Sequence, residues 1–248
     1  MYDQIETGLK EYKRSDLGLF LSSLSAGLEV GFSILTIGVI YTLFKNESTT
    51  GELAVMMALV YPIGYIFVIT GRSELFTEHT TLATLPVMTG KATLGSLAKL
   101  WLLVYTGNIV GGYIFGSITL IFNAEMHLIG KDFFYFVSEK MVKYNVSATL
   151  ISGIMAGWLM GMLSWLLSSA QDTFSRVVMI FLVTFVISIA GLHHCIVGSI
   201  EVFMAFFGHA NQITPLQFLK FQALTTLGNI IGGVVLVAIV KFAHSKRH

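Results

Sequence analysis

The sequence ITGRSELFTEHT, residues 69–80, places four ionisable side chains inside an otherwise apolar segment. The apolar run LAVMMALVYPIGYIFVI leads into it, and the mostly apolar TLATLPVM follows it. Charged side chains that face lipid cost several kcal/mol each, and a broken helix in lipid adds unsatisfied backbone groups. This stretch is therefore expected to line a cavity or to be buried in protein. The four residues are Arg72, Glu74, Glu78 and His79.

Composition places the chain among proteins that cross a membrane several times. Hydrophobic residues make up 54% of the 248 residues, charged residues only 12%, and the mean hydropathy is +0.77. One globular core cannot bury that much apolar surface, which excludes a soluble single domain. The net charge of +1 and the scattered Lys and Arg residues offer no surface for nucleic acid. The polar start, MYDQIETGLKEYKRSD, has no apolar core for a cleavable signal peptide.

Six stretches are long enough to cross about 30 Å of hydrocarbon at about 20 residues each. They are residues 17–44, 53–88, 96–122, 147–169, 177–207 and 216–243. Nine of the 15 Lys and Arg residues then fall on one side and five on the other, with Arg72 inside the membrane. The positive-inside rule predicts that both termini are cytoplasmic. The loop 123–146 then lies outside, and its FFYFV segment is predicted to form a short interfacial helix.

An internal repeat organises these segments. GNIVGG at 107–112 recurs 121 residues later as GNIIGG at 228–233, and Gly71 before RSELFT lies 120 residues before Gly191, which precedes LHHCIV. A weaker echo relates SAGLEVG to MAGWLMG. Three helices in each half require the second half to be inverted relative to the first, as in many transporters and channels.

The repeat predicts one all-α transmembrane domain over residues 1–248, with inverted repeats at about 17–122 and 147–243. Its second and fifth helices are expected to be interrupted at Gly71 and Gly191, since glycine lets a helix end and turn. The half-helices that follow present free N–H groups and a positive dipole end near the midplane. An anion is the ligand that such ends favour.

The same residues resemble the formate/nitrite transporter family. The similarity rests on GRSELFT and KATLGSLAKLWLLVYTGNIVGG in the first half and on GLHHCIVGS and GNIIGG in the second. It implies an aquaporin-like fold of six helices, assembled as a homopentamer in a bacterial cytoplasmic membrane and surrounded by lipid. It also implies transport of small monovalent anions or their conjugate acids, with no cofactor, no metal and no enzyme activity.

The resemblance assigns pore positions residue by residue. Thr77 matches the family's threonine on the loop that interrupts helix two, and His194 matches the histidine at the break of helix five. These side chains can offer a hydroxyl and an imidazole donor to an anion, although Thr77 can also cap the half-helix behind it. Leu75 and Phe76 match apolar residues that narrow the pore. Further constrictions are expected near Tyr61, Tyr65 and Ile187.

Five more residues are expected to support the loop or to lie near the pore. They are Arg72, Glu74, Trp158, His193 and Lys143. Trp158 aligns with a helix-four asparagine of the formate channels, Lys143 aligns within one residue of their vestibule lysine, and His193 stands where several relatives have a glutamate. Glu74 is expected to hold the loop through backbone N–H groups, and Arg72 to form a buried pair with Glu74 or Glu201.

A second hypothesis uses the consecutive residues His193, His194 and Cys195. Together with the acidic stretch after Gly71, they could bind a soft or borderline metal and make the chain a metal-ion transporter. Consecutive residues rarely converge on one ion, however, and the sequence has no histidine pair at helical i, i+4 spacing. The anion pore is therefore the favoured interpretation.

Overall fold

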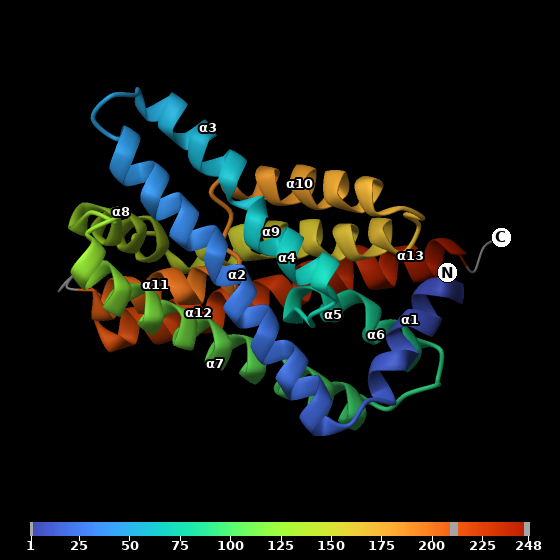
Figure 1. The fold of residues 1–248 in the computed structure, drawn as a ribbon. Coiled ribbons are helices and arrows are strands. Elements are labelled where there is room, and N and C mark those ends of the chain that lie inside the picture. The colour runs from blue at the N-terminus through green and yellow to red at the C-terminus, as the bar shows by residue number, and fades with distance from the viewer. Residues whose placement is uncertain (1, 209–212, 246–248) are drawn as a thin grey trace.

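The computed structural model of the chain describes residues 2–208 and 213–245, and within these ranges every regular element is a helix (Figure 1). The helices are α1 (Tyr2–Tyr12), α2 (Asp16–Phe44), α3 (Thr50–Val60), α4 (Pro62–Gly71), α5 (Phe76–Leu82), α6 (Thr84–Met88), α7 (Leu94–Met126), α8 (Lys131–Val142), α9 (Val146–Leu167), α10 (Thr173–Ile189), α11 (Val197–Phe207), α12 (Pro215–Ile231), a π-helical segment (Gly232–Ile239) and α13 (Val240–Ser245). Lys246 and Arg247, which contribute to the predicted topology, lie outside the described residues.

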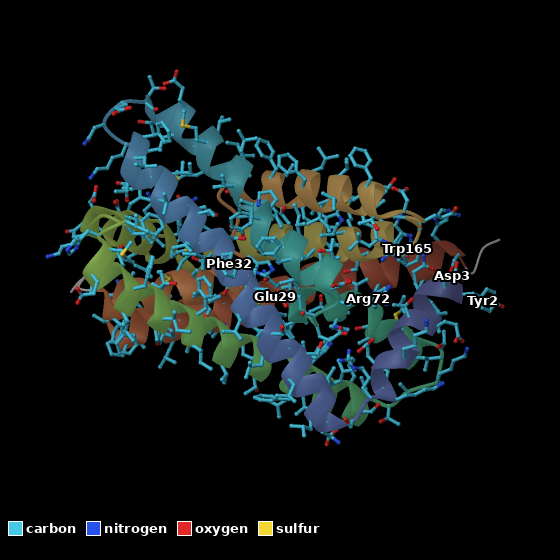
Figure 2. All side chains as sticks on the ribbon, viewed as in Figure 1. Tyr2, Asp3, Glu29, Phe32, Arg72 and Trp165 are labelled. Carbon is cyan, nitrogen blue, oxygen red and sulfur yellow. The ribbon has the colours of Figure 1, made fainter. Side chains whose placement is uncertain are left out.

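Five helical stretches of the described chain are long and apolar enough to cross a membrane. They are Asp16–Phe44, Thr50–Gly71, Leu94–Met126, Val146–Leu167 and Pro215–Ser245. The segment 177–207, which was predicted to be interrupted after Gly191, forms two shorter apolar helices, α10 and α11. Large apolar side chains such as Phe32 are exposed on the outer faces of the long helices (Figure 2), as expected for surfaces that meet lipid or another subunit.

Glycine residues let two pairs of helices approach closely. Helix α2 packs along α7, and α9 packs along α12. A Cβ atom added at Gly27 of α2 would collide with the backbone oxygen of Asn108 on α7, and one added at Gly157 of α9 would collide with that of Asn229 on α12. The GNIVGG and GNIIGG motifs thus lie at backbone-to-backbone contacts, where small residues are required.

The chain turns after α4 and after α10 in the same way. Ser73 N–H bonds the Val68 carbonyl at 2.9 Å, and Leu192 N–H bonds the Ile187 carbonyl at 2.9 Å. This is the hydrogen bond of a Schellman helix end, which needs one left-handed residue. That residue is Gly191 (φ 63°) after α10, but after α4 it is Arg72 (φ 60°). The prediction that Gly71 supplies the turn is wrong by one residue.

Helix α1 is an element that the sequence analysis did not predict. Its residues Gln4, Ile5 and Gly8 are buried, and it packs against α5 and α6. Tyr12, at its end, donates a hydrogen bond of 2.5 Å to the Ala83 carbonyl. At the other end of the molecule, α8 contains the FFYFV segment predicted to be a short helix (Figure 1).

Candidate functional site

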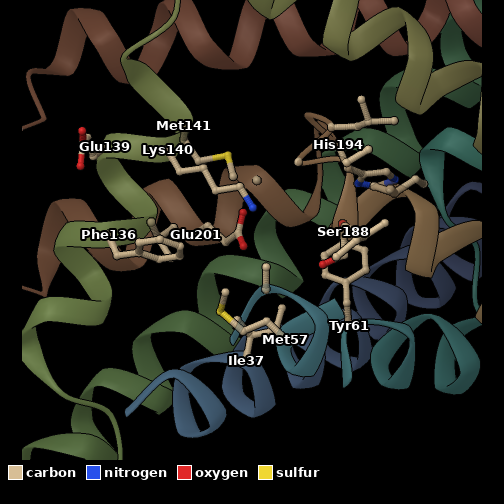
Figure 3. A pocket seen from close by; sticks show the side chains of 18 of the residues that line it. Ile37, Met57, Tyr61, Phe136, Glu139, Lys140, Met141, Ser188, His194 and Glu201 are labelled. Carbon is tan, nitrogen blue, oxygen red and sulfur yellow. The ribbon is translucent and has the colours of Figure 1, made fainter. Parts of the chain in front are cut away.

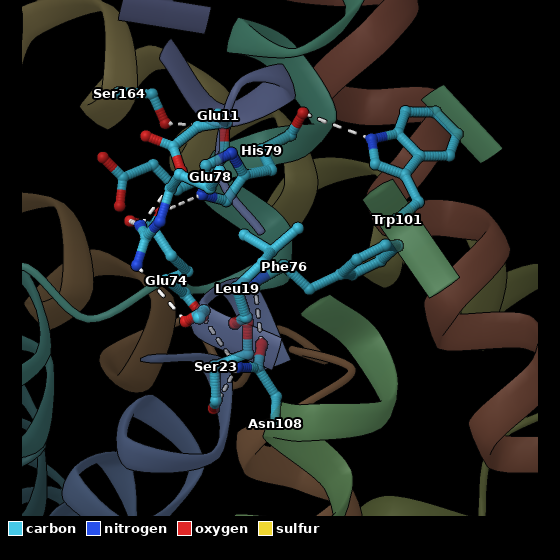
Figure 4. A network of polar contacts seen from close by, with 12 residues as sticks. Glu11, Leu19, Ser23, Glu74, Phe76, Glu78, His79, Trp101, Asn108 and Ser164 are labelled. Atoms are coloured by element: carbon cyan, nitrogen blue, oxygen red, sulfur yellow. Dashed lines mark hydrogen bonds and ion pairs between the residues drawn. The ribbon is translucent and has the colours of Figure 1, made fainter. Parts of the chain in front are cut away.

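Asn108 holds the chain between α4 and α5. Its side chain is fully buried on α7, and its Oδ1 accepts a hydrogen bond of 2.8 Å from the N–H of Phe76, the first residue of α5. Its Nδ2 donates to the carbonyls of Glu74 at 2.8 Å and Ser23 at 2.7 Å (Figure 4). One amide therefore satisfies two backbone groups that the interrupted helix would otherwise leave without partners, and its third bond ties the break to α2.

Asn229 does the same for the chain between α10 and α11. Its Oδ1 accepts from the N–H of Cys195 at 2.8 Å, and its Nδ2 donates to the carbonyls of His193 at 3.0 Å and Gly153 at 2.8 Å. The contacts of Asn108 and Asn229 correspond one to one. This role of the two asparagines was not predicted, although a polar residue inside each of the repeated motifs GNIVGG and GNIIGG was the available signal.

The two supported segments bring Thr77 and His194 together. Thr77 Oγ1 lies 2.8 Å from His194 Nε2, and both side chains are buried, with 0% and 2% exposure. On the other side of the ring, Nδ1 accepts a hydrogen bond of 3.3 Å from the N–H of Val197. A backbone N–H only donates, so Nδ1 carries no proton in this arrangement. The ring is then the neutral tautomer whose Nε2–H donates to Thr77.

One cavity borders His194, and a second borders Glu78, the residue that follows Thr77. The first, which we name the α8 cavity, has a volume of 340 Å³ and is lined by His194, Tyr61, Ile187, Glu201, Lys140 and Lys143, among others. The second, the α1 cavity, has a volume of 520 Å³ and includes Glu11, Arg14, Glu74, Glu78 and His79 in its lining. Because α8 and α1 are at opposite ends of the molecule (Figure 1), the cavities open toward opposite ends.

The predicted constriction residues lie around the Thr77–His194 pair. Leu75 and Phe76 directly precede Thr77 and are 0% and 2% exposed. The ring of Tyr65 makes an edge contact with the His194 ring at 5.4 Å between centroids, and its hydroxyl lies 2.8 Å from the Tyr61 hydroxyl. Ile187 is fully buried at the α8 cavity. Of these five residues, Tyr65 contacts His194 directly, whereas the Phe76 ring packs against Trp101 and Tyr105.

An ionic network forms part of the lining of the α1 cavity. Glu74 pairs with Arg14 and with His79, and Arg14 also bonds Glu11 at 3.1 Å (Figure 4). The predicted pairs of Arg72 with Glu74 or Glu201 are wrong, because within the described residues Arg72 takes part in no ion pair and Arg14 occupies that role. Burial raises the pKa of Glu11 above its ordinary value, and His79 and Arg14 oppose that shift.

The α8 cavity contains a lysine that sequence analysis missed. Lys143 borders this cavity, as expected of a vestibule lysine, but its Nζ lies 5.3 Å from the centre of the Tyr144 ring. Lys140, one helical turn earlier on α8, extends its ammonium group into the cavity toward Glu201 (Figure 3). The signal in the sequence was the i, i+3 spacing, which puts both lysines on one face of a helix.

Trp158 and His193 do not join the pair. Trp158 is 46% exposed on α9, so the structure gives no support to its predicted place near the pore. His193 is buried between the rings of Tyr144 and Phe221, at 5.6 and 5.7 Å. Its ring therefore faces away from the Thr77–His194 contact. The backbone N–H of Cys195 donates its hydrogen bond to Asn229 Oδ1. The rings of His193 and His194 thus have different neighbours, which does not favour the metal-transport hypothesis.

An all-helical body with apolar outer faces, two internal cavities and a buried polar pair near them is the architecture of a polytopic channel or transporter. The family model described as formate/nitrite transporter matches residues 1–243, and the chain belongs to this family. It is thus an anion channel or transporter of the formate/nitrite type.

Three similar proteins are consistent with this assignment. The chain is 32% identical to the inner membrane protein YfdC of Escherichia coli K12 over 244 residues, which cover 96% of this chain and 75% of that protein. Among solved structures, an "FNT family ion channel" superposes with a TM-score of 0.86 at 23% identity, covering 98% of this chain and 99% of the other. A "pentameric formate channel with formate bound" superposes with a TM-score of 0.80 at 23% identity, covering 93% and 97%.

Proposed function

We propose that the α8 cavity, the Thr77–His194 pair and the α1 cavity form one path for a small monovalent anion or its conjugate acid. The observation that carries the proposal is the 2.8 Å contact between Thr77 Oγ1 and His194 Nε2. The two groups come from helix breaks in different halves of the chain, and cavities flank them. The hydrogen bond satisfies both buried groups, and both can bond a polar substrate in its place.

The pair can exchange its own hydrogen bond for bonds to the substrate. In the neutral tautomer, His194 Nε2–H donates to Thr77, and the Thr77 hydroxyl proton remains available. An oxygen of the substrate can therefore accept both donors at once. Passage beyond the pair is between Leu75, Phe76 and Ile187, all buried apolar side chains. A bare anion leaves water for such a constriction at high cost, whereas the neutral acid does not.

We propose that residues 1–248 form one domain with six membrane crossings and that this domain contains the path. Helices α3 to α6 form an interrupted second crossing, and α10 with α11 an interrupted fifth. The matching contacts of Asn108 and Asn229 support the inverted repeat of about 17–122 and 147–243. A second support is that Gly27 and Gly157 meet equivalent atoms of these asparagines.

The assembly is proposed to be a homopentamer in a bacterial cytoplasmic membrane with both termini inside. The formate channel similar to this chain is pentameric, and the relative YfdC is an inner membrane protein. In this orientation Lys140 and Lys143 lie at the outer cavity, where positive charge concentrates anions. Native mass spectrometry in mild detergent should give the mass of five chains.

A flux assay in liposomes tests the function. Purified protein is expected to carry members of a panel of formate, nitrite, acetate, lactate, hydrosulfide and chloride, measured at two pH values, and flux of weak acids should rise as pH falls. His194→Phe keeps an aromatic ring but removes both nitrogens, so it should abolish flux. His193→Phe is the matched control and should change flux little. Transport of cations alone, or undiminished flux through His194→Phe, would contradict the proposal.

A further inference from the structure

Glu201 is a buried carboxyl group that has no hydrogen-bond partner among the described residues. It lies on α11, is only 8% exposed, and borders the α8 cavity together with His194. Within the described part of the chain, its carboxylate makes neither a hydrogen bond nor an ion pair. A buried polar group normally has a partner, so a carboxylate directed into a cavity calls for one.

Lys140 supplies a positive charge in the same cavity. Figure 3 shows its ammonium group pointing toward the Glu201 carboxylate, while the neighbouring Glu139 points away. The ammonium and the carboxylate interact electrostatically but do not form a direct ion pair. Both therefore keep free hydrogen-bonding positions that face the same space of 340 Å³.

A carboxylate is an unexpected group in the path of an anion. It repels negative charge, and a lysine alone would attract the substrate better. A carboxylate is useful, however, for a substrate that brings its own hydrogen-bond donor, because an ionised carboxylate only accepts hydrogen bonds. Charge-assisted hydrogen bonds of this kind are about twice as strong as neutral ones.

We propose that Lys140 and Glu201 form a binding subsite for small monoanions that carry a hydroxyl group, such as 2-hydroxycarboxylates. Lys140 receives the carboxylate of the substrate, and Glu201 accepts a hydrogen bond from its hydroxyl. This inference rests on the proposed path, since it assigns the substrate class that enters from the α8 cavity. Formate, nitrite and acetate have no such donor, so they leave Glu201 without a partner and meet its repulsion.

The test compares glycolate with acetate, two monoanions of similar size that differ by one hydroxyl. Binding to the purified full chain is measured by competition or thermal shift, and initial flux is measured in liposomes at substrate concentrations below saturation. The wild type is expected to prefer glycolate, and Glu201→Leu should lower the glycolate-to-acetate ratio by about tenfold, the effect of one hydrogen bond to a charged group. Each acid keeps its own acidity in every variant, so a changed ratio reports on the protein.

Three further variants separate the contributions. Glu201→Gln keeps the shape and an acceptor oxygen but removes the charge, so acetate flux should rise while a partial preference remains. Lys140→Met should weaken both acids together. Glu139→Gln, on the same helix but with its carboxyl group directed away, is the matched control and should leave the ratio unchanged.

Two outcomes are decisive and distinguishable from failure of the proposed function. Equal binding of glycolate and acetate by the wild type, or an unchanged ratio in a folded Glu201→Leu or Glu201→Gln protein, overturns the subsite. Selective glycolate binding that disappears in Glu201→Leu supports the subsite even if neither acid crosses the membrane, and that absence of flux would count against the path alone.

Discussion

Replacement of Asn108 by leucine tests whether one buried amide holds the chain break that carries Thr77. The substitution keeps the volume and removes three hydrogen bonds of 2.7 to 2.8 Å to the backbone of Ser23, Glu74 and Phe76. Polar contacts within membrane proteins contribute about 0.6 kcal/mol each and buried neutral bonds up to about 1.5 kcal/mol, so the expected loss is about 2 to 4 kcal/mol. Thr77 follows Phe76 directly, so flux should fall as well.

The assay is reversible unfolding in mixed detergent micelles, with formate flux measured in parallel. Asn108→Asp distinguishes the contribution of the amide oxygen from that of the amide nitrogen. It keeps the acceptor for Phe76 N–H but loses both donated hydrogen bonds. Asn123 serves as the control, since its side chain also bonds backbone groups, those of Ile129, but at the far end of α7. Asn123→Leu should lower stability without changing flux relative to folded protein. Wild-type stability and flux in Asn108→Leu would refute the proposed role of the amide.

Three further predictions concern packing, α1 and the polar pair. Gly27→Val should destabilise the protein by more than about 2 kcal/mol, because the new side chain meets backbone of α7 that cannot move aside, whereas Gly51→Val has nothing within 4 Å and should unfold at nearly the same temperature. Arg14→Gln removes the partner of Glu74 and should release α1, which trypsin cleavage after Lys10 or Lys13 would detect; unchanged cleavage would mean that the ionic network does not hold α1. Thr77→Val removes the hydroxyl at constant shape and should lower flux about tenfold or more without changing assembly, and wild-type flux would exclude the hydroxyl from the path.

The positions of the helix breaks could be predicted because charge and glycine within apolar segments have few explanations. Four ionisable residues at 69–80 and the repeated glycine motifs both pointed to polar segments buried in protein. The exact register could not be predicted. Matching glycine with glycine paired Gly71 with Gly191, but the left-handed residues are Arg72 and Gly191. A non-glycine residue can occupy that conformation at a cost of about 1 kcal/mol when hydrogen bonds hold it.

The contacts of α1 and α8 depend on tertiary packing and so could not be predicted from the sequence. Helix α1 has little apolar character of its own, and its stability comes from docking against α5 and α6. Arg14 therefore looked like a cytoplasmic charge, whereas it pairs with Glu74. For α8, the family resemblance placed Lys143 near a vestibule, but the sequence could not show that Lys140 points into the α8 cavity. The rotation of α8 about its own axis decides which side chain points inward, and the packing of α8 against neighbouring helices sets that rotation.

The two helix breaks make matching backbone contacts but differ in the side chains that they carry. Glu74 and His193 make equivalent contacts with Asn108 and Asn229, and so do Phe76 and Cys195, a separation of 119 residues in both cases. The same separation relates Leu75 to His194, whose carbonyls accept the N–H groups of His79 and Gly198.

By this correspondence, the position of His194 is apolar in the first half, and the position of Thr77 is occupied by the buried Ile196 in the second. Each break thus contributes one polar and one apolar side chain. The hydrogen bond of the polar pair therefore joins one break to the other, and matching backbone contacts hold an asymmetric site. Any difference between inward and outward transport must then come from these side chains and from the unequal cavities. It follows that Leu75→His combined with His194→Leu should move the ring to the first half and alter the ratio of inward to outward flux in oriented liposomes. An unchanged ratio in a folded and active double variant would show that the cavities alone set the direction.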